Sequence, residues 1–323
     1  MEQAQIQRPI LFLEPQLKEN IWGGSRLGTE YGYPLPGSHT GECWGISAHP
    51  NGDDTIKEGT FAGKKLSELW QQHRYLFGNL TMDRFPLLVK IIDAKDDLSI
   101  QVHPDDAYAA AHENGSLGKT ECWYILDCPQ DAQLVVGHHA QTKEELEEMI
   151  HEGRLDELIR KIPIQKGDFI QIDPGTVHAI TAGCMILETQ QSSDVTYRVY
   201  DYNRLTDGKP RQLHIAQSID VIKVPAKSVD DSVQHLSGLA ENVWHEMIAC
   251  PYYRVFKLNL NGTYHFEQKY PFLNVSVLEG GGVINGQTLK KGDHFILPAG
   301  YGEVQLQGEM EWIASTVGEG ITT

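Results

Sequence analysis

Four side chains from three separate segments could together hold a metal ion. Gln101 and His103 are two residues apart in LSIQVH, and side chains two apart on a β-strand point to the same face. Glu121 opens the apolar segment TECWYIL, and His178 follows a Pro-Gly turn. One amide oxygen, two imidazoles and one carboxylate suit a borderline divalent ion such as zinc and leave room for water or a substrate. We therefore interpret these four residues as a candidate active site that holds one zinc ion per chain.

The strands that would carry these side chains are short apolar segments separated by turns. Ile100 and Val102 alternate with the polar pair and are expected to face the core. After His103 the chain makes a polar, Ala-rich excursion and returns at Glu121, and a strand and a tight turn lead to His178. Closure of such strands into a barrel would bring all four side chains into one mouth.

An internal repeat favours a pair of barrels. The stretch 290–304, KKGDHFILPAGYGEV, resembles the stretch 165–180, QKGDFIQIDPGTVHAI, because both contain KGD, an apolar strand and a turn with Pro and Gly. The second copy has Gly302 at about the place where the first has His178. This pattern is typical of two jelly-roll or cupin barrels, one of which keeps metal ligands while the other has lost them.

We therefore predict a mainly β fold of two cupin (jelly-roll) barrels with a small helical insertion. The catalytic cupin domain is expected to span residues 1–225, including the insertion near 142–162, where TKEELEEMIHEGRLDELIRK shows a capping box and helical spacing. A weakly patterned linker is expected over 223–243. The C-terminal barrel, which lacks metal ligands, is expected over residues 244–323.

Three local patterns give further structural predictions. The segment 210–222, PRQLHIAQSIDVI, indicates a helix. The run 280–282, GGG, is not followed by a helical pattern, so a hairpin turn is favoured over a phosphate-binding loop. Lys90 lies inside the apolar run PLLVKII and must find a partner, a solvent opening or an anion. The simplest interpretation of Lys90 is a surface lysine whose ammonium group reaches water.

Composition excludes several classes of function. The chain has 323 residues, of which 40% are hydrophobic and 22% are charged, as is ordinary for a globular protein. A net charge of −17 makes nucleic acid or an anionic membrane a poor partner. No basic and apolar leader opens the sequence and no apolar run reaches the roughly 18 residues of a membrane span, so we expect a soluble, cytoplasmic protein. Its five cysteines lack CxxC spacing, which argues against disulfides and a thiolate zinc site. No obligate protein partner is evident.

Four motifs occur in a recognisable order along the chain, namely LSIQVHPDD, KTECWYI, PGTVHAI and SDVTYRV. Together they resemble type I phosphomannose isomerase in its short bacterial form, from the IWGG turn to about Ile222. The resemblance implies a bicupin fold, one zinc ion and interconversion of mannose 6-phosphate with fructose 6-phosphate. The larger helical domain of longer family members is reduced here to the region 142–161.

The resemblance also implies roles for individual residues. The residues that it marks as zinc ligands are Gln101, His103, Glu121 and His178. Arg198 matches the catalytic arginine of the family. Lys90 and Lys119 match lysines that the family places near the sugar phosphate or the reacting carbons. We accordingly assign Arg198 and Lys119 to catalysis and Lys90 to substrate binding. We also assign Glu188, a charged residue that borders an apolar strand, to substrate binding.

The residues are compatible with aldose–ketose chemistry, which moves a proton between carbons 1 and 2 through an enediol. A divalent cation would polarise the carbonyl and stabilise the oxyanion. Arg198 could stabilise the enediolate or hold the phosphate by bidentate contacts. The sequence leaves the base open between Glu188, Lys119, a metal-bound hydroxide and a histidine.

Two other readings compete with the isomerase. A cupin metalloenzyme of another reaction class, such as an iron oxygenase, would share histidine and glutamate ligands but would not need Lys90, Lys119 and Arg198 for a phosphate. A non-enzymatic, sugar-binding bicupin would keep both barrels and could lose the cationic groups. Metal content and isomerase activity distinguish the three.

Overall fold

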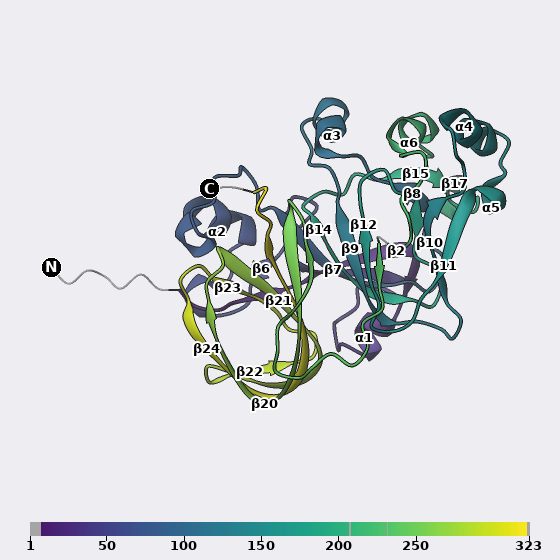
Figure 1. The fold of residues 1–323 in the computed structure, drawn as a ribbon. Helices are drawn as coiled ribbons and strands as arrows, with labels where there is room; N and C mark the ends of the chain where they lie inside the picture. Colours follow the sequence, from purple (N-terminus) through teal and green to yellow (C-terminus); the bar gives the residue numbers. More distant parts are fainter. Residues whose placement is uncertain (1–7, 207, 231, 322–323) are drawn as a thin grey trace. The chain divides into compact units, whose positions relative to one another are not determined.

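The computed structural model describes residues 8–206, 208–230 and 232–321 (Figure 1). The chain is mainly β, and it forms two compact units that are each described on their own. Among the described residues, none of the helices combines the length and the apolar character needed to span a bilayer. All five cysteines are free thiols, as the sequence predicts.

The first unit, here called the C-terminal unit, consists of the described residues of Met1–Gln16, Trp44–Val89 and Gly238–Thr323. It contains an eight-stranded sheet made, in spatial order, of β19 (His245–Ala249), β20 (Tyr253–Gln268), β24 (Gly302–Val317), β21 (Phe272–Ile284), β23 (His294–Pro298), β1 (Leu11–Glu14) and β6 (Thr55–Ile56), with β22 (Gln287–Lys290) paired to β21. Its other elements are the pair β4 (Ala48–His49) and β5 (Gly52–Asp53), the helix α2 (Leu66–Gln72) and the 3-10 turns η1 (Gly59–Phe61) and η2 (Arg74–Phe77). The segment 44–89, which the sequence analysis placed within residues 1–225, is thus part of the unit that contains the C-terminal strands.

The second unit, here called the central unit, consists of Leu17–Cys43 and the described residues of Lys90–Ser237. One sheet has five strands in the order β11 (Ile159–Pro163), β10 (Gln133–His138), β13 (His178–Ala179), β8 (Ile100–Val102) and β15 (Tyr197–Tyr200). A seven-stranded sheet has the order β18 (Val233–Gln234), β12 (Phe169–Ile172), β9 (Glu121–Asp127), β14 (Met185–Gln191), β7 (Leu87–Asp93), β3 (Thr40–Ile46) and β2 (Gln16–Gly24), and the boundary between the two units falls within β7, β3 and β2. The remaining elements are α1 (Arg26–Thr29), α3 (Asp106–His112), α4 (Lys143–His151), α5 (Leu155–Leu158), α6 (Ile215–Val221) and the pair β16 (Leu205–Thr206) and β17 (Lys209–Pro210).

The two sheets of the central unit share an apolar core. Trp123 and Ile170 of the seven-stranded sheet pack in one buried cluster with Leu134 and Val136 of the five-stranded sheet. The other face of the five-stranded sheet is covered by helices α4 and α6 (Figure 1). Because side chains alternate along a strand, every second residue of β8, β13 and β15 points between the two sheets, and the residues between them face the helices.

The internal repeat is confirmed at the level of individual hydrogen bonds. In the first copy the Asp168 carboxylate accepts from the backbone N–H of Gln165 at 2.9 Å, and in the second the Asp293 carboxylate accepts from Lys290 N at 2.9 Å. The glycine of KGD has a φ of +91° in one copy and +87° in the other, a region that favours glycine. The same turn therefore precedes β12 and β23.

The strand registers show which residues the two copies of the repeat have at equivalent positions. Pairing of β12 with β9 and of β23 with β21 places Leu273 where the first copy has Glu121. Strand β13 begins at His178, whereas β24 begins at Gly302. Where the first copy has the candidate ligands Glu121 and His178, the second copy therefore has a leucine and a glycine, and neither can bind a metal ion through its side chain.

The helical insertion is shorter than its sequence pattern. Thr142 caps α4 by accepting from Glu145 N at 3.2 Å, and Gly153, with a φ of +72°, separates α4 from α5. The predicted helix is wrong beyond Leu158, because Ile159–Pro163 forms β11 and pairs with β10. Without β11, the backbone N–H and C=O groups along this edge of β10 would lack partners. Pairing of 159–163 as a strand satisfies them, which explains why the helix does not continue.

The helix predicted over 210–222 is also shorter, since α6 covers Ile215–Val221. The N–H of His214 donates to the carbonyl of Arg198 at 2.8 Å, which ties the preceding segment to β15. A tertiary hydrogen bond thus decides where this helix begins.

The glycine run 280–282 was wrongly predicted to be a hairpin turn, because it lies inside the long strand β21. A Cβ on Gly280 would lie 2.0 Å from Glu309 O, and one on Gly282 would lie 2.2 Å from Gln307 O. The glycines are needed because β24 approaches closely.

Candidate active site

Three predicted site residues form a row across the five-stranded sheet. Gln101 on β8 lies directly opposite His178 on β13 and opposite Arg198 on β15. Directly opposed residues on neighbouring strands share a face. Because Ile100 and Val102 pack with the helix-covered cluster, this row points toward the seven-stranded sheet.

The two histidines are oriented by backbone carbonyls. His103 Nδ1 lies 2.8 Å from Val195 O, and His178 Nδ1 lies 2.9 Å from Thr176 O. A carbonyl oxygen can only accept, so both Nδ1 atoms carry the proton and both Nε2 atoms present a lone pair. The two Nε2 atoms are 3.1 Å apart.

Glu121, which begins β9 on the seven-stranded sheet, completes a buried group with the two histidines. Its Oε2 lies 3.4 Å from His103 Nε2, and its Oε1 lies 3.4 Å from His178 Nε2. Oε1 is buried and has no hydrogen-bond partner among the described residues. All three ligand atoms fall within 4.8 Å of one another.

This arrangement fits a small divalent ion. Four ligands at zinc distances of about 2.0–2.1 Å from a tetrahedral centre are separated by roughly 3.3 Å, and the separations here are 3.1 to 3.4 Å. Two imidazole lone pairs that face each other repel unless a cation or a proton donor lies near both. The backbone bonds at Nδ1 are the outer contacts that metal-ligating histidines ordinarily make.

Gln101 lies beside this group with its amide nitrogen inward. Its Nε2 is 3.2 Å from His178 Nε2 and donates to that lone pair, while its Oε1 accepts from Ser99 Oγ at 3.2 Å. A half-turn of the amide would present the oxygen instead. The structure thus places Gln101 beside the two histidines and Glu121, as the strand spacing predicts. Its amide nitrogen, a hydrogen-bond donor, faces them in place of the oxygen that would bind a metal ion.

Lys119 supplies a positive charge to the same group. Its Nζ donates to His103 Nε2 at 3.1 Å and to Glu121 Oε2. Burial alone would raise the pKa of Glu121, but Lys119 and the two imidazoles hold that pKa well below its usual value. Burial and the adjacent ammonium lower the pKa of His103 to about 3, and burial also lowers the pKa of His178. The group therefore combines one carboxylate with two neutral imidazoles.

Lys90 and Glu188 form a second buried pair next to this group. Lys90 Nζ lies 3.2 Å and Lys119 Nζ lies 3.7 Å from Glu188 Oε1. The interpretation of Lys90 as a surface lysine is wrong, since it is 6% exposed. Burial alone would lower its pKa, but Glu188, Glu42 and Glu121 raise the pKa above its usual value. Lys90 therefore stays protonated inside the unit.

Arg198 projects from the edge strand β15 of the five-stranded sheet and is half-buried. Its Nε is buried without a hydrogen-bond partner among the described residues. Burial and the nearby Arg211 lower the pKa of Arg198 from its usual value, although an arginine remains charged. A buried, unsatisfied guanidinium N–H is suited to an anionic ligand.

Three supporting residues were missed by sequence reasoning. Ser99 orients Gln101, Trp123 Nε1 donates to Glu188 Oε2 at 3.0 Å, and His214 Nδ1 accepts from the N–H of Arg198 at 3.2 Å. Strand alternation from Glu121 could have found Trp123, which is two residues further along the same strand. No comparable signal marks His214, because its contact is between distant segments.

The fold and the site define a mainly β protein of the cupin type with a buried histidine and glutamate centre. Residues 10–155 match the family described as phosphomannose isomerase type I, catalytic domain, and residues 245–317 match the one described as mannose-6-phosphate isomerase, cupin domain. The mannose-6-phosphate isomerase ManA of Bacillus subtilis is 51% identical over 310 residues, which are 94% of this chain and 98% of that protein. The mannose-6-phosphate isomerase of Streptococcus mutans is 49% identical over 312 residues, 94% and 97% of the two chains.

A solved structure agrees with these relatives. The crystal structure of mannose 6-phosphate isomerase from Bacillus subtilis superposes with a TM-score of 0.88 at 45% identity, and the match covers 96% of this chain and 100% of that one. The chain belongs to the type I phosphomannose isomerase family and is an enzyme of the isomerase class. The expectation that the sequence motifs raised is confirmed at the level of family and fold.

Proposed function

We propose that this chain interconverts mannose 6-phosphate and fructose 6-phosphate through an enediol, with one zinc ion bound per chain. The observation that carries the proposal is the convergence of the two Nε2 lone pairs and the Glu121 carboxylate at 3.1 to 3.4 Å. Lys119 pairs with Glu121 of that centre. Arg198, whose Nε has no hydrogen-bond partner among the described residues, lies in the same cross-strand row as Gln101 and His178. The names of the relatives supply mannose 6-phosphate as the substrate, and the motif resemblance supplies fructose 6-phosphate.

His103, Glu121 and His178 would hold the metal ion, and Gln101 would add its amide oxygen after a half-turn. When bound, a zinc ion supplies Lewis acidity toward a carbonyl oxygen and charge for a developing oxyanion. Neutral imidazoles and an ionised carboxylate are the protonation states that this set needs, and both follow from the pKa directions of these groups.

The proton transfer between carbons 1 and 2 requires a group that accepts and returns a proton. Lys119 and Glu188 lie 3.7 Å apart beside the candidate metal ligands, so either can serve one reacting carbon. We assign the catalytic role to Lys119, because it contacts both His103 and Glu121. Glu188, which Trp123 orients, is assigned to a substrate hydroxyl.

Two cationic groups remain for the negative charge of the sugar phosphate. Arg198 would stabilise the enediolate, since it lies in the same row as Gln101 and His178 and has an unsatisfied N–H. Lys90 would bind the substrate through its ammonium group, which Glu188 keeps in place. Cations in contact with the phosphate outweigh the distant acids of a chain with net charge −17, because salt largely screens charges that are more than about 8 Å away.

Metal analysis followed by an isomerase assay tests the proposal. Purified protein should contain one zinc per chain and convert mannose 6-phosphate to fructose 6-phosphate, and a chelator should remove both zinc and activity. Iron in place of zinc, without isomerase activity, would favour the other cupin metalloenzymes. Zinc without isomerase activity would favour a sugar-binding protein.

A further inference from the structure

A hollow of the central unit lies on the face of the five-stranded sheet that is opposite the candidate active site. It has a volume of about 660 Å³, within the range of small-ligand pockets. Ile100 and Val199 form part of its floor, and each immediately adjoins in sequence a residue of the site row, Gln101 or Arg198. Alternation of side chains therefore separates the two sites by the thickness of the sheet. We call this hollow the helix-side groove, since α4 and α5 contribute Ile150 and Leu155 to its wall.

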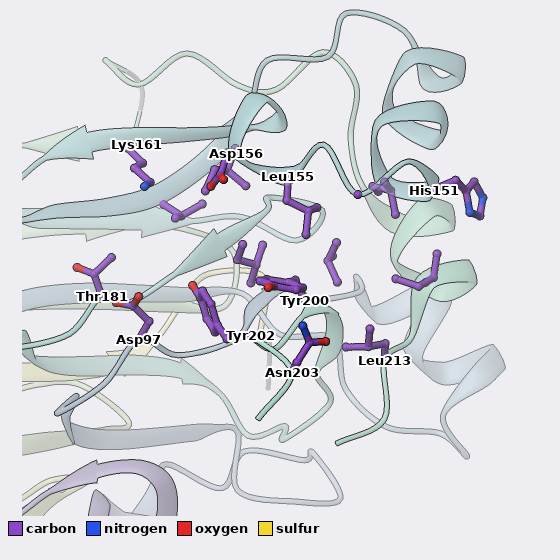
Figure 2. Close-up of a pocket in the computed structure, with 17 residues that line it drawn as sticks. Asp97, His151, Leu155, Asp156, Lys161, Thr181, Tyr200, Tyr202, Asn203 and Leu213 are labelled. Carbon is purple, nitrogen blue, oxygen red and sulfur yellow. The ribbon is translucent and has the colours of Figure 1, made fainter. Parts of the chain in front are cut away.

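Two tyrosines project into the helix-side groove. The rings of Tyr200 and Tyr202 have centroids 5.0 Å apart at an interplanar angle of 62°. Figure 2 shows both rings pointing into the hollow, with Asp97 and Thr181 on one side and Asn203 on the other. Tyr202 is 36% exposed, so part of its side chain is accessible to a ligand.

Tyr202 lies in a turn whose backbone conformation is unfavourable for a residue as bulky as tyrosine. Tyr202 and Asn203 have φ values of +54° and +53°, and Arg204 N donates to Asp201 O at 3.1 Å. Positive φ at both central residues is the geometry of a type I′ turn, where Asn-Gly is preferred and a bulky residue is a genuine outlier. Such outliers cluster at ligand sites when the surrounding structure imposes them.

The surrounding structure does impose this conformation. Asp201 is 3% exposed and its carboxylate accepts from Arg204 Nη2 at 2.5 Å and from Arg211 Nε at 2.7 Å. Arg204 also donates to Asp97 O at 2.5 Å, and its guanidinium lies 5.1 Å from the centre of the Tyr202 ring. The exposed ring is thus held in place by buried ion pairs, which is the preorganisation that a binding site needs.

The polar lining indicates the chemical class of the ligand. Asp97 and Asp156 carry negative charge, Lys161 carries positive charge, and Asn203 and Thr181 are neutral hydrogen-bonding groups. With His151 of the lining counted as neutral, the two aspartates leave an excess of negative charge over Lys161, so an anion would gain no net attraction here. A pyranose ring offers one face of C–H groups for an aromatic ring and a rim of hydroxyls for carboxylates and amides. The tyrosine rings of the groove, together with its aspartate and asparagine side chains, match that pattern.

From these observations we propose that the helix-side groove binds an uncharged pyranose, with Tyr202 as the stacking platform and Asp156 and Asn203 among the groups that receive its hydroxyls. The proposal does not depend on the reaction at the candidate active site. A ligand in the groove would leave the row of Gln101, His178 and Arg198 accessible, because it would lie on the opposite face of β8 and β15.

Calorimetric titration with methyl α-D-mannopyranoside and methyl α-D-glucopyranoside tests the proposal. These glycosides cannot open to an aldehyde and carry no phosphate, so they are not substrates of an aldose–ketose isomerase. The wild-type chain should bind at least one of them, and saturating mannose 6-phosphate should leave that binding unchanged. Tyr202→Ala should weaken it about tenfold, because a ring contact is lost, whereas Tyr202→Phe should retain it.

Two further variants sharpen the result. Asp156→Ala should weaken glycoside binding several-fold, by roughly the worth of one hydrogen bond. Val243→Ala, at a 44% exposed position outside the groove, is the matched control and should change nothing. Thermal unfolding of each variant verifies that the fold is intact, and the isomerase activity of Tyr202→Ala should equal that of the wild type.

Four outcomes would overturn the proposal. One is the absence of heat with both glycosides. Another is equal affinity in the wild type and in Tyr202→Ala. The third is competition between the glycoside and mannose 6-phosphate, which would place the binding in the candidate active site. Binding of adenosine without binding of either glycoside would likewise count against a pyranose site.

Discussion

Leu273 occupies in the C-terminal unit the position that Glu121 occupies in the central unit. Both residues lie opposite the end of the strand that follows the KGD turn. Leu273 is 1% exposed in an apolar cluster, whereas Glu121 meets two histidines and a lysine. The same backbone arrangement therefore carries a packing residue in one copy and a candidate ligand in the other.

We predict from this relationship that the C-terminal unit binds no metal. Among the described residues, the structure has one group of at least three metal-capable side chains, and it lies in the central unit. Metal analysis should give one equivalent of zinc per wild-type chain and none in His178→Ala. Tightly bound metal that persists in His178→Ala would contradict a single site.

We predict that His178→Ala removes metal and isomerase activity together. Loss of one of two imidazoles leaves Glu121 and His103 to hold the ion, and activity should fall by more than about 100-fold. Gln101→Ala should lower zinc affinity less, because a neutral amide contributes less charge stabilisation than a carboxylate. Zinc content and initial rates, measured on the same preparations, check both statements. Full zinc occupancy in His178→Ala would rule out its role as a ligand.

Arg198 and Lys90 should respond differently to replacement by alanine. If Arg198 acts on the enediolate, which exists only along the reaction path, Arg198→Ala should lower kcat by about 100-fold to 1000-fold with little change in KM. Lys90→Ala should mainly raise KM. Arg198→Lys serves as a matched control that keeps the charge and loses the planar fork. A near-normal kcat in Arg198→Ala would overturn the catalytic assignment.

The stability of the C-terminal unit should decrease in acid through His294. This histidine is buried, and burial lowers its pKa from 6.5 to about 4. The unfolded chain therefore binds one proton more than the folded unit between these values, and stability falls as pH falls through that window. Each pH unit below 6.5 should lower the free energy of unfolding by about 1.4 kcal/mol.

Urea unfolding at several pH values checks this prediction. His294→Phe copies the residue that the first repeat has at the equivalent position, Phe169, and removes the titrating group. Its unfolding free energy should change less with pH than that of the wild type between pH 6.5 and about 4. Parallel pH curves for the two proteins would show that another group controls acid unfolding.

The sequence by itself determined which side chains could meet. Spacing of two along a strand placed Gln101 and His103 on one face, and the KGD repeat indicated a second copy without ligands. Four ordered motifs indicated the family, which the relatives confirm. These features are local or repeated, so alternation and comparison within one chain suffice to find them.

The tertiary structure decided everything that depends on neighbours from distant segments. The sequence shows Lys90 only as a lysine within an apolar strand. Its partner Glu188 comes from β14, which lies next to β7 in the folded sheet. The extent of α5 and α6 followed from pairing of β11 with β10 and from the bond between His214 and Arg198. The tautomers of both histidines depend on carbonyls that lie outside their strand patterns. Partners for buried polar groups come from whichever segment folding brings near, and a sequence does not state that proximity.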